Sequence, residues 1–429
     1  MRHKFQLLVV TLAVFASAYA LTVISPLQEA MRNALAMSDN SMALLQGPTR
    51  VWPQLIAAVP LGLLIDRYSR VHLLLAFAVL DILGTLATAL ASSNFALLFA
   101  VRSLVGLAGA ATLTTAISLL ADLYGADQRG RAMMVMGVGQ VAGISTAFML
   151  GGHILEHFGS DHDAWKWTLY WLTVPLIAIA VLMLRLHEPA RSEVSVSQRS
   201  ARDSLMEVWL YRAQIMALLG GALVIDIGLG AAYVWAPPAL SRGFVLTSAR
   251  LGEIMGVVFL ISGWIGPIIG GALADLCQRT GGPRRTTIVL AMLAIVSAPS
   301  GSFALAPSVL LAGALLVVFL TLLPAVSLMV TTLCTVVIPN EIRGLCVALL
   351  NAICDVFAFM LAPVVVSVSS GILGGAAMLA EALSITCIGT AIIGAAAFAF
   401  AGKYVRQPQT CAKLGGSENC QVIERAQSV

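Results

Sequence analysis

The sequence predicts an all-α membrane protein, with twelve transmembrane helices in two six-helix halves and both termini in the cytoplasm. Three observations support this prediction. The content of charged residues is very low, long apolar stretches recur along the chain, and lysine and arginine are distributed unevenly between those stretches.

Of the 429 residues, 59% are hydrophobic and only 11% are charged. A soluble domain carries about 25% charged residues, so this chain lacks the polar surface that a water-soluble fold of its length needs. The composition therefore excludes a soluble enzyme, a disordered scaffold and a nucleic-acid-binding protein. The seven cysteines form no CxxC pair and most lie in apolar stretches. We expect buried thiols, no disulfide framework, no metal site and no cofactor.

Apolar stretches long enough to cross a bilayer recur along the whole chain, since a transmembrane helix needs about 20 mostly apolar residues. The first stretch also resembles a secretory signal, but the even number of spans favours an uncleaved helix. The predicted spans, twelve in all, are residues 6–28, 43–65, 71–92, 95–120, 132–156, 166–187, 213–237, 250–274, 285–304, 307–338, 344–370 and 376–402.

Lysine and arginine indicate the orientation, because these residues accumulate in cytoplasmic loops. With the N-terminus inside, 19 of them fall in cytoplasmic segments and 4 in outer segments. The polar segment 188–212 reads as a cytoplasmic linker between the halves, residues 1–187 and 213–402, and residues 403–429 form a cytoplasmic tail. The halves repeat a pattern at an offset of 209 residues, since Gly62 and Asp66 correspond to Gly271 and Asp275.

Three segments carry a specific resemblance. Residues 62–70, with Asp66, Arg67 and Arg70, resemble the signature loop of the major facilitator superfamily. Residues 102–110 resemble its fourth-helix motif, and residues 122–131 resemble its fourth cytoplasmic-side loop. The pattern is most similar to the spinster-like branch, which handles lysolipids and related amphiphiles. This resemblance implies a transporter that works by alternating access, with a cavity between its halves.

The sequence departs from the spinster-like pattern where that branch carries acidic residues. Residues 16–20 contain no acid, and Gly109 stands where the branch often has a glutamate. The usual proton site of the branch is therefore not carried over. The helix-five motif of drug–proton antiporters is also interrupted, because Ile144 replaces its proline.

Charged residues inside the apolar spans are the first functional candidates, because each costs at least about 2.5–3.5 kcal/mol to insert. We expect Arg50 and Arg102 to bind an anionic substrate group, since a guanidinium offers a planar fork to carboxylate or phosphate. We expect Asp226 or Asp355 to carry the coupling proton. The alternative is static ion pairing between helices. Asp81 lies in a span that is usually peripheral and is interpreted as structural.

Aromatic residues near the same level could contact a ring-bearing or apolar substrate. We assign Tyr19, Tyr233 and Trp235 to the substrate site, with helix packing or interfacial anchoring as the alternative.

The loops are predicted to form a gate on the cytoplasmic side. We expect Asp66 to pair with bases of the adjoining loops, such as Arg129 or Arg131, and Asp275 to pair with Arg343. The full set of gating residues is Asp66, Arg67, Arg70, Arg129, Arg131, Asp275 and Arg343.

Together these features predict a proton-coupled secondary transporter, by symport, for a small organic anion or an anionic amphiphile such as a lysolipid. Its expected partners are the substrate, the coupling proton and the lipid bilayer, and we expect a monomer in the inner (plasma) membrane. The alternatives are multidrug or metabolite efflux by proton antiport, and a non-transporting membrane receptor on the same fold.

Overall fold

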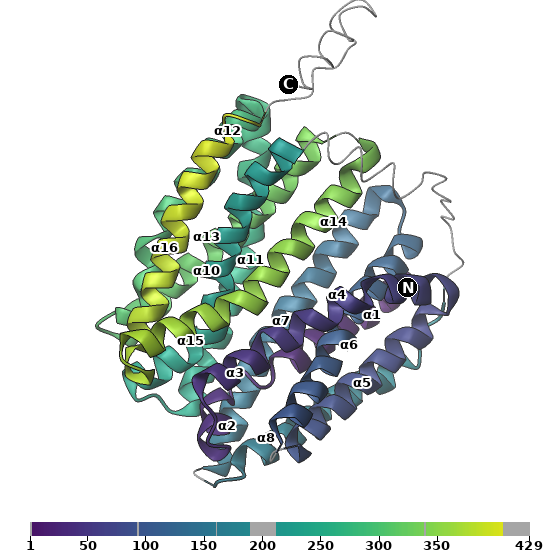
Figure 1. The fold of residues 1–429 in the computed structure, drawn as a ribbon. Helices are drawn as coiled ribbons and strands as arrows, with labels where there is room; N and C mark the ends of the chain where they lie inside the picture. The colour runs from purple at the N-terminus through teal and green to yellow at the C-terminus, as the bar shows by residue number, and fades with distance from the viewer. Residues whose placement is uncertain (1, 92–93, 160, 189–211, 339, 406–429) are drawn as a thin grey trace, which may run out of the picture.

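The structure is a computed structural model that describes residues 2–91, 94–159, 161–188, 212–338 and 340–405. The described residues form helices and short connections, with no β-strand among them. Eleven of the described helices are long and apolar enough to cross a membrane. Figure 1 shows these helices running side by side in one bundle. The prediction of an all-α membrane protein is confirmed.

Local sequence signals start many of the N-terminal helices. The side chains of Ser38, Ser69 and Asn94 accept hydrogen bonds from the first turns of α3, α5 and α6, which satisfies backbone donors that lack a helical partner. The helices of this part are α1 (Arg2–Thr22), α2 (Gln28–Ala34), α3 (Asp39–Gln46), α4 (Pro48–Arg67), α5 (Arg70–Leu90), α6 (Phe95–Leu123), α7 (Ala126–Phe158) and α8 (Ala164–Met183).

The C-terminal helices include one that changes its winding in mid-span. A π-helical turn, η2 (Phe357–Leu361), separates α14 (Asn340–Val356) from α15 (Ala362–Leu373). The other helices are α10 (Arg212–Phe244), α11 (Ser248–Thr280), α12 (Gly282–Ser297), η1 (Pro299–Leu305), α13 (Val309–Val337), η3 (Ala376–Met378) and α16 (Leu379–Ala401).

The predicted second span, residues 43–65, is not one helix. The chain breaks between α3 and α4 at Gly47, and Pro48 starts the new helix at a position where proline's missing N–H costs nothing. Helix α4 is not among the eleven apolar candidates, since it carries Arg50, Gln54 and internal prolines. The number of twelve spans therefore stays a prediction.

Two other predicted boundaries were wrong. The first span was expected to reach residue 28, but α1 ends at Thr22 and a turn leads into α2. The seventh was expected to end at residue 237, but α10 continues through Pro237 and Pro238 to Phe244. The predicted linker and tail lie almost wholly outside the described residues, which resume at Arg212 and end at Val405.

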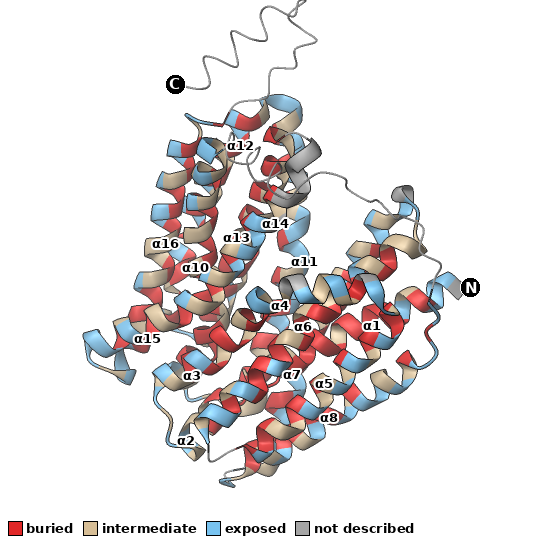
Figure 2. Ribbon diagram, turned by 45° about the vertical axis from the view of Figure 1, so that its right-hand side comes forward, coloured by how far each residue is buried: buried red, intermediate tan, exposed pale blue. Residues whose placement is uncertain are grey.

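The buried apolar residues fall into separate groups. One cluster is built almost entirely from α10 to α16, and three smaller clusters are built from α1 to α8. Figure 2 shows buried residues along the inner faces of both groups of helices, and shows the groups diverging away from α2 and α3. We call the end of the bundle at α2 and α3 the loop end, and the end at which α1 begins and α16 finishes the termini end.

The two groups of helices meet tightly at the loop end, where α7 crosses α11. A Cβ on Gly152 would lie 2.3 Å from the carbonyl oxygen of Ser248, and a Cβ on Gly252 would lie 2.4 Å from that of Phe148. Only glycine permits this approach of two backbones. The neighbouring side chains of Ser367 in α15 and Asn40 in α3 are joined by a hydrogen bond of 2.6 Å.

Candidate functional site

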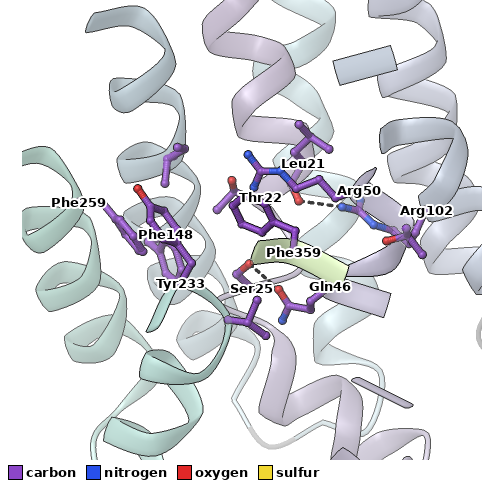
Figure 3. Close-up of a pocket in the computed structure, with 13 residues that line it drawn as sticks. Leu21, Thr22, Ser25, Gln46, Arg50, Arg102, Phe148, Tyr233, Phe259 and Phe359 are labelled. Carbon is purple, nitrogen blue, oxygen red and sulfur yellow. Dashed lines mark hydrogen bonds between the residues drawn. The ribbon is translucent and has the colours of Figure 1, made fainter. Parts of the chain in front are cut away.

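The centre of the bundle contains two adjoining cavities that share Arg50. The cavity nearer the loop end is narrow, about 30 Å³, and the one towards the termini end is wider, about 260 Å³. Figure 3 shows the residues of the narrow cavity, which come from both groups of helices. Residues that line both cavities are Leu21, Arg50, Ile144 and Phe359.

Arg50 reaches the cavities from the first turn of α4. Its guanidinium carbon lies 4.4 Å from the centre of the Phe359 ring, which belongs to the π-helical turn of the other group of helices. Within the described residues, no ion pair or side-chain hydrogen bond involves this guanidinium. A cation held over an aromatic face keeps its N–H donors available at the ring's edge. Arg50 can therefore donate to an anionic group in the cavity.

The acidic candidates occupy different positions relative to the cavities. Asp355 lines the wider cavity, is exposed to it, and attracts Arg50 across it. Asp226 is only 9% exposed and lines neither cavity. Its carboxylate accepts a hydrogen bond of 2.6 Å from the hydroxyl of Ser327 in α13. The structure thus places Asp355 beside Arg50 and buries Asp226 behind it.

Arg102 also lines the narrow cavity; its two terminal nitrogens are bonded to backbone carbonyls, and its Nε has no hydrogen-bond partner among the described residues. Its guanidinium donates to the carbonyl oxygens of Ala20 and Leu21 at 3.3 and 2.8 Å. These carbonyls lie in the last turn of α1, where they lack helical partners and where the helix dipole favours a cation. Asp81 is buried near Ser17 and attracts Arg102. Through these hydrogen bonds Arg102 holds the C-terminal end of α1.

The aromatic candidates also differ in whether they line a cavity. Tyr233 lines the narrow cavity and its ring lies 4.9 Å from that of Phe259 and 6.3 Å from that of Phe359, centre to centre. Tyr19 and Trp235 are fully buried and line neither cavity. Trp235 donates a hydrogen bond of 2.9 Å to the carbonyl of Pro363, which makes it a packing residue.

At the termini end, one arginine of the signature loop is the centre of a buried cluster. Arg70 is 4% exposed and forms ion pairs with Asp122 and, at 3.0 Å, with Glu188. The carboxylate of Glu188 also accepts from the backbone amide of Val71 and from the hydroxyl of Ser69. These contacts join the starts and ends of α5, α6 and α8, which belong to one half.

The Glu188 carboxyl lies outside the spans. Its partial burial alone would raise its pKa, but the hydrogen bonds from Val71, Ser69 and Arg70 outweigh burial and hold the pKa below its usual value.

The other predicted gating residues are placed as follows. Arg67, Arg131 and Asp275 are exposed, and Arg129 donates to the carbonyl of Ala121 at 2.8 Å. The side chains of Asp66 and Arg343 lie outside the described residues, so the predicted pairs of Asp66 with Arg129 or Arg131, and of Asp275 with Arg343, stay predictions.

Sequence reasoning missed a polar chain and an aromatic residue of the narrow cavity. Ser25 donates to the side chain of Gln46 at 2.9 Å, and Gln46 donates to Gln28 at 2.7 Å. Phe359 was overlooked because a phenylalanine in an apolar span carries no signal, although it follows Asp355 by one helical turn. Among the described residues no group of histidine, cysteine and acidic side chains could hold a metal ion.

The site combines an available guanidinium, a facing carboxylate and several aromatic walls between two groups of membrane helices. Comparison with known proteins agrees with a transport role: the sequence profile of the Major Facilitator Superfamily matches residues 10–363.

Two relatives are similar to parts of this chain. Protein spinster homolog 1 of Bos taurus is 28% identical over 293 residues, which cover 63% of this chain and 54% of the relative. A probable triacylglyceride transporter of Mycobacterium leprae (strain TN) is 32% identical over 176 residues, which cover 40% of this chain and 32% of the relative. The chain thus matches about half the length of the spinster relatives.

Two solved structures share the fold. A bacterial homologue of the human lysosomal transporter spinster, in an inward-facing and unoccupied conformation, superposes with a TM-score of 0.82 at 18% identity, covering 95% of this chain and 99% of that one. A D-xylose–proton symporter gives 0.71 at 16% identity, with the same coverage. The chain is similar to spinster proteins, and it belongs to the Major Facilitator Superfamily of multi-pass membrane transporters.

Proposed function

We propose that this protein is a proton-coupled secondary transporter for a small organic anion or an anionic amphiphile such as a lysolipid. Two halves, residues 1–187 and 213–402, alternate access to a site between them. Both termini face the cytoplasm, and the protein works as a monomer in the inner (plasma) membrane. The widening of the cavities towards the termini end supports a cytoplasm-open state.

The observation that carries the substrate class is the guanidinium of Arg50. It faces a cavity without an ion pair among the described residues, and its ring partner Phe359 leaves its donors available. A half-buried cation without an ion pair is costly in a membrane, so an incoming carboxylate or phosphate would gain a strong charge-assisted contact. The rings of Phe148, Tyr233 and Phe259 offer an apolar wall for the rest of the substrate.

We assign proton coupling to two aspartates of the C-terminal half, Asp355 and Asp226. Asp355 competes with the substrate anion for Arg50, so neutralising Asp355 by a proton would release Arg50 for the substrate. Asp226 lies behind it and is held by Ser327. A proton would then enter together with the substrate, so the expected mode of transport is symport.

The gate at the termini end is proposed to involve the signature loop and its counterpart in the second half. Arg70 holds α5 against α6 and α8. Arg67, Arg131 and Asp275 are exposed at this end and free to meet partners when the halves close.

Uptake by proteoliposomes tests the proposal. The purified protein is reconstituted, and accumulation of a labelled anionic lysophospholipid and of labelled organic acids is followed with a pH gradient imposed across the bilayer. We expect accumulation above that of empty liposomes, its loss on adding a protonophore, and little transport of an uncharged monoacylglycerol. Equal transport of the uncharged lipid, or no transport of any anion, would contradict the proposal. Antiport would appear as efflux driven by the opposite gradient.

A further inference from the structure

Another cavity of the molecule lies outside the central site, on the surface that faces the bilayer. It is a groove of about 810 Å³ at the loop end, between α7, α11 and α13. That volume falls within the range of about 300–1,000 Å³ of small-molecule sites. Figure 1 shows these three helices as neighbours near the middle of the bundle. The walls are almost entirely apolar, formed by Met149, Ile254, Val257, Leu310, Gly313 and Val317.

The outer rim of the groove is charged. Glu253 in α11 is bound on one side by Arg250, at 3.1 Å, and on the other by His153 of α7, at 3.3 Å. All three side chains are accessible, with exposed fractions of 65% for Arg250, 53% for His153 and 38% for Glu253. They stand within the first turns of α11 and the last turns of α7, where these helices reach the loop end.

The apolar part of the groove extends from this rim into the membrane. Helix α13 contributes residues from Val309 to Val317, a length of about 12 Å at 1.5 Å per residue. Leu310 is 86% exposed and Val257 is 46% exposed, so the groove is open to the acyl chains of the bilayer. A charged rim above an apolar channel matches the shape of a lipid, with its headgroup at the interface and a chain below it.

We propose that this groove binds one phospholipid with an amine-bearing, zwitterionic headgroup such as phosphoethanolamine. Arg250 binds the phosphate, Glu253 binds the ammonium, and one acyl chain lies along α13. The pair of opposite charges selects this class: a lipid with a purely anionic headgroup would have no ammonium to offer the Glu253 carboxylate, and a sterol would offer nothing to Arg250.

The position of the groove gives this lipid a structural role. Met149 and His153 come from the N-terminal group of helices, whereas Arg250 and Leu310 come from the C-terminal group. The groove lies beside the crossing of α7 and α11 at Gly152. A lipid bound there contacts both halves at the point where they meet and stabilises the arrangement that is closed at the loop end.

Photo-crosslinking tests the proposal without any transport measurement. The full-length protein is reconstituted in nanodiscs with a phosphatidylethanolamine that carries a diazirine in one acyl chain, and labelled residues are mapped by mass spectrometry. We expect labelling concentrated at Val257, Leu310 and Val317. Unlabelled phosphatidylethanolamine should compete for this labelling about tenfold better than phosphatidylglycerol, the ratio expected for one charge-assisted contact.

Two variants of groove residues make the crosslinking experiment specific for this site. Gly313→Leu fills the groove, since a Cβ there meets only Ile254, at 3.8 Å. Its matched control is Gly389→Leu in α16, where no atom lies within 4 Å of the Cβ position. Only Gly313→Leu should abolish the concentrated labelling. Glu253→Gln, at an accessible side chain, should remove the preference for phosphatidylethanolamine while labelling persists. Labelling spread evenly around the bundle, or unchanged by Gly313→Leu, would overturn the proposal.

Discussion

The guanidinium of Arg50 in α4 lies 4.4 Å from the ring centre of Phe359, a residue of the other group of helices. Only one turn from Phe359, Asp355 faces the same guanidinium across a water-accessible cavity. One cation is thus shared between an aromatic ring and a carboxylate of the opposite half. We expect binding of the substrate and of the coupling proton to change how strongly Arg50 interacts with each of these two groups.

The first prediction concerns Phe359. Replacing it with leucine removes the cation–π contact, which is worth about 0.5–2 kcal/mol, so the guanidinium of Arg50 loses its fixed position. We expect the affinity for an anionic substrate to fall about 2- to 30-fold. Phe359→Tyr keeps the ring and should bind nearly as wild type. Equilibrium binding of a fluorescent anionic lysolipid measures both, and equal affinities of wild type and Phe359→Leu would refute the prediction.

A second prediction separates proton coupling from substrate binding. In Asp226→Asn the amide oxygen can still accept the hydrogen bond that Ser327 makes at 2.6 Å, so the fold should persist. The amide cannot release a proton, and we expect accumulation driven by a pH gradient to be lost while exchange of substrate at equal pH continues. Asp355→Asn, made in parallel, should also lose accumulation driven by the pH gradient, and in addition it should raise the affinity for the anion because Arg50 loses a competitor. If Asp226→Asn accumulates substrate normally, Asp226 does not carry the proton.

Some of this site could be predicted from the sequence. The apolar spans and the rarity of charge marked Arg50, Asp226 and Asp355 as functional candidates, since such residues are costly in a membrane. The partners of these residues could not be predicted. A span that is hydrophobic on all sides has no periodicity that tells which face meets the cavity. For this reason Tyr19 and Trp235 were assigned to the substrate site, although the structure packs them away from it.

The partners of the signature-loop arginine could not be predicted from the sequence either. The motif marked Arg70 as important, but its acidic partners Asp122 and Glu188 are 52 and 118 residues away in sequence. Only the packing of α5 against α6 and α8 brings them together. The π-helical turn at Phe357 was equally hidden, because it has no proline within it and depends on neighbouring helices.

The third prediction is a cost to stability at the Arg70 cluster. Arg70→Gln removes the ion pair between Arg70 and the carboxylate of Asp122, which is 8% exposed. Breaking a buried ion pair on one side costs about 3–5 kcal/mol. We expect a clear fall in the thermal unfolding temperature of the purified protein in detergent. Arg284→Gln, at an exposed arginine of α12, is the matched control and should unfold as wild type. No difference between the two variants would contradict the assignment.

The pH dependence of Glu188 is the fourth prediction. Its carboxyl has a lowered pKa in the folded protein, so it binds a proton more readily when unfolded. The stability it contributes is therefore complete above the unfolded value of about 4.3 and is lost as the pH falls through the lower folded value. The difference in unfolding temperature between wild type and Glu188→Gln should be constant near neutral pH and shrink in this acidic range. A difference that grows on acidification would have the wrong sign.

We propose that Arg50 binds the anionic group of the substrate. The most direct measurement compares the affinities of an anionic lysophospholipid and an uncharged monoacylglycerol of the same chain length for wild type, Arg50→Gln and Arg284→Gln, by isothermal titration calorimetry in detergent. A charge-assisted contact of about 1.5–3 kcal/mol predicts that wild type and Arg284→Gln favour the anion by at least about tenfold. Arg50→Gln should bind both ligands equally. If Arg50→Gln keeps the preference for the anion, Arg50 does not bind the anionic group of the substrate.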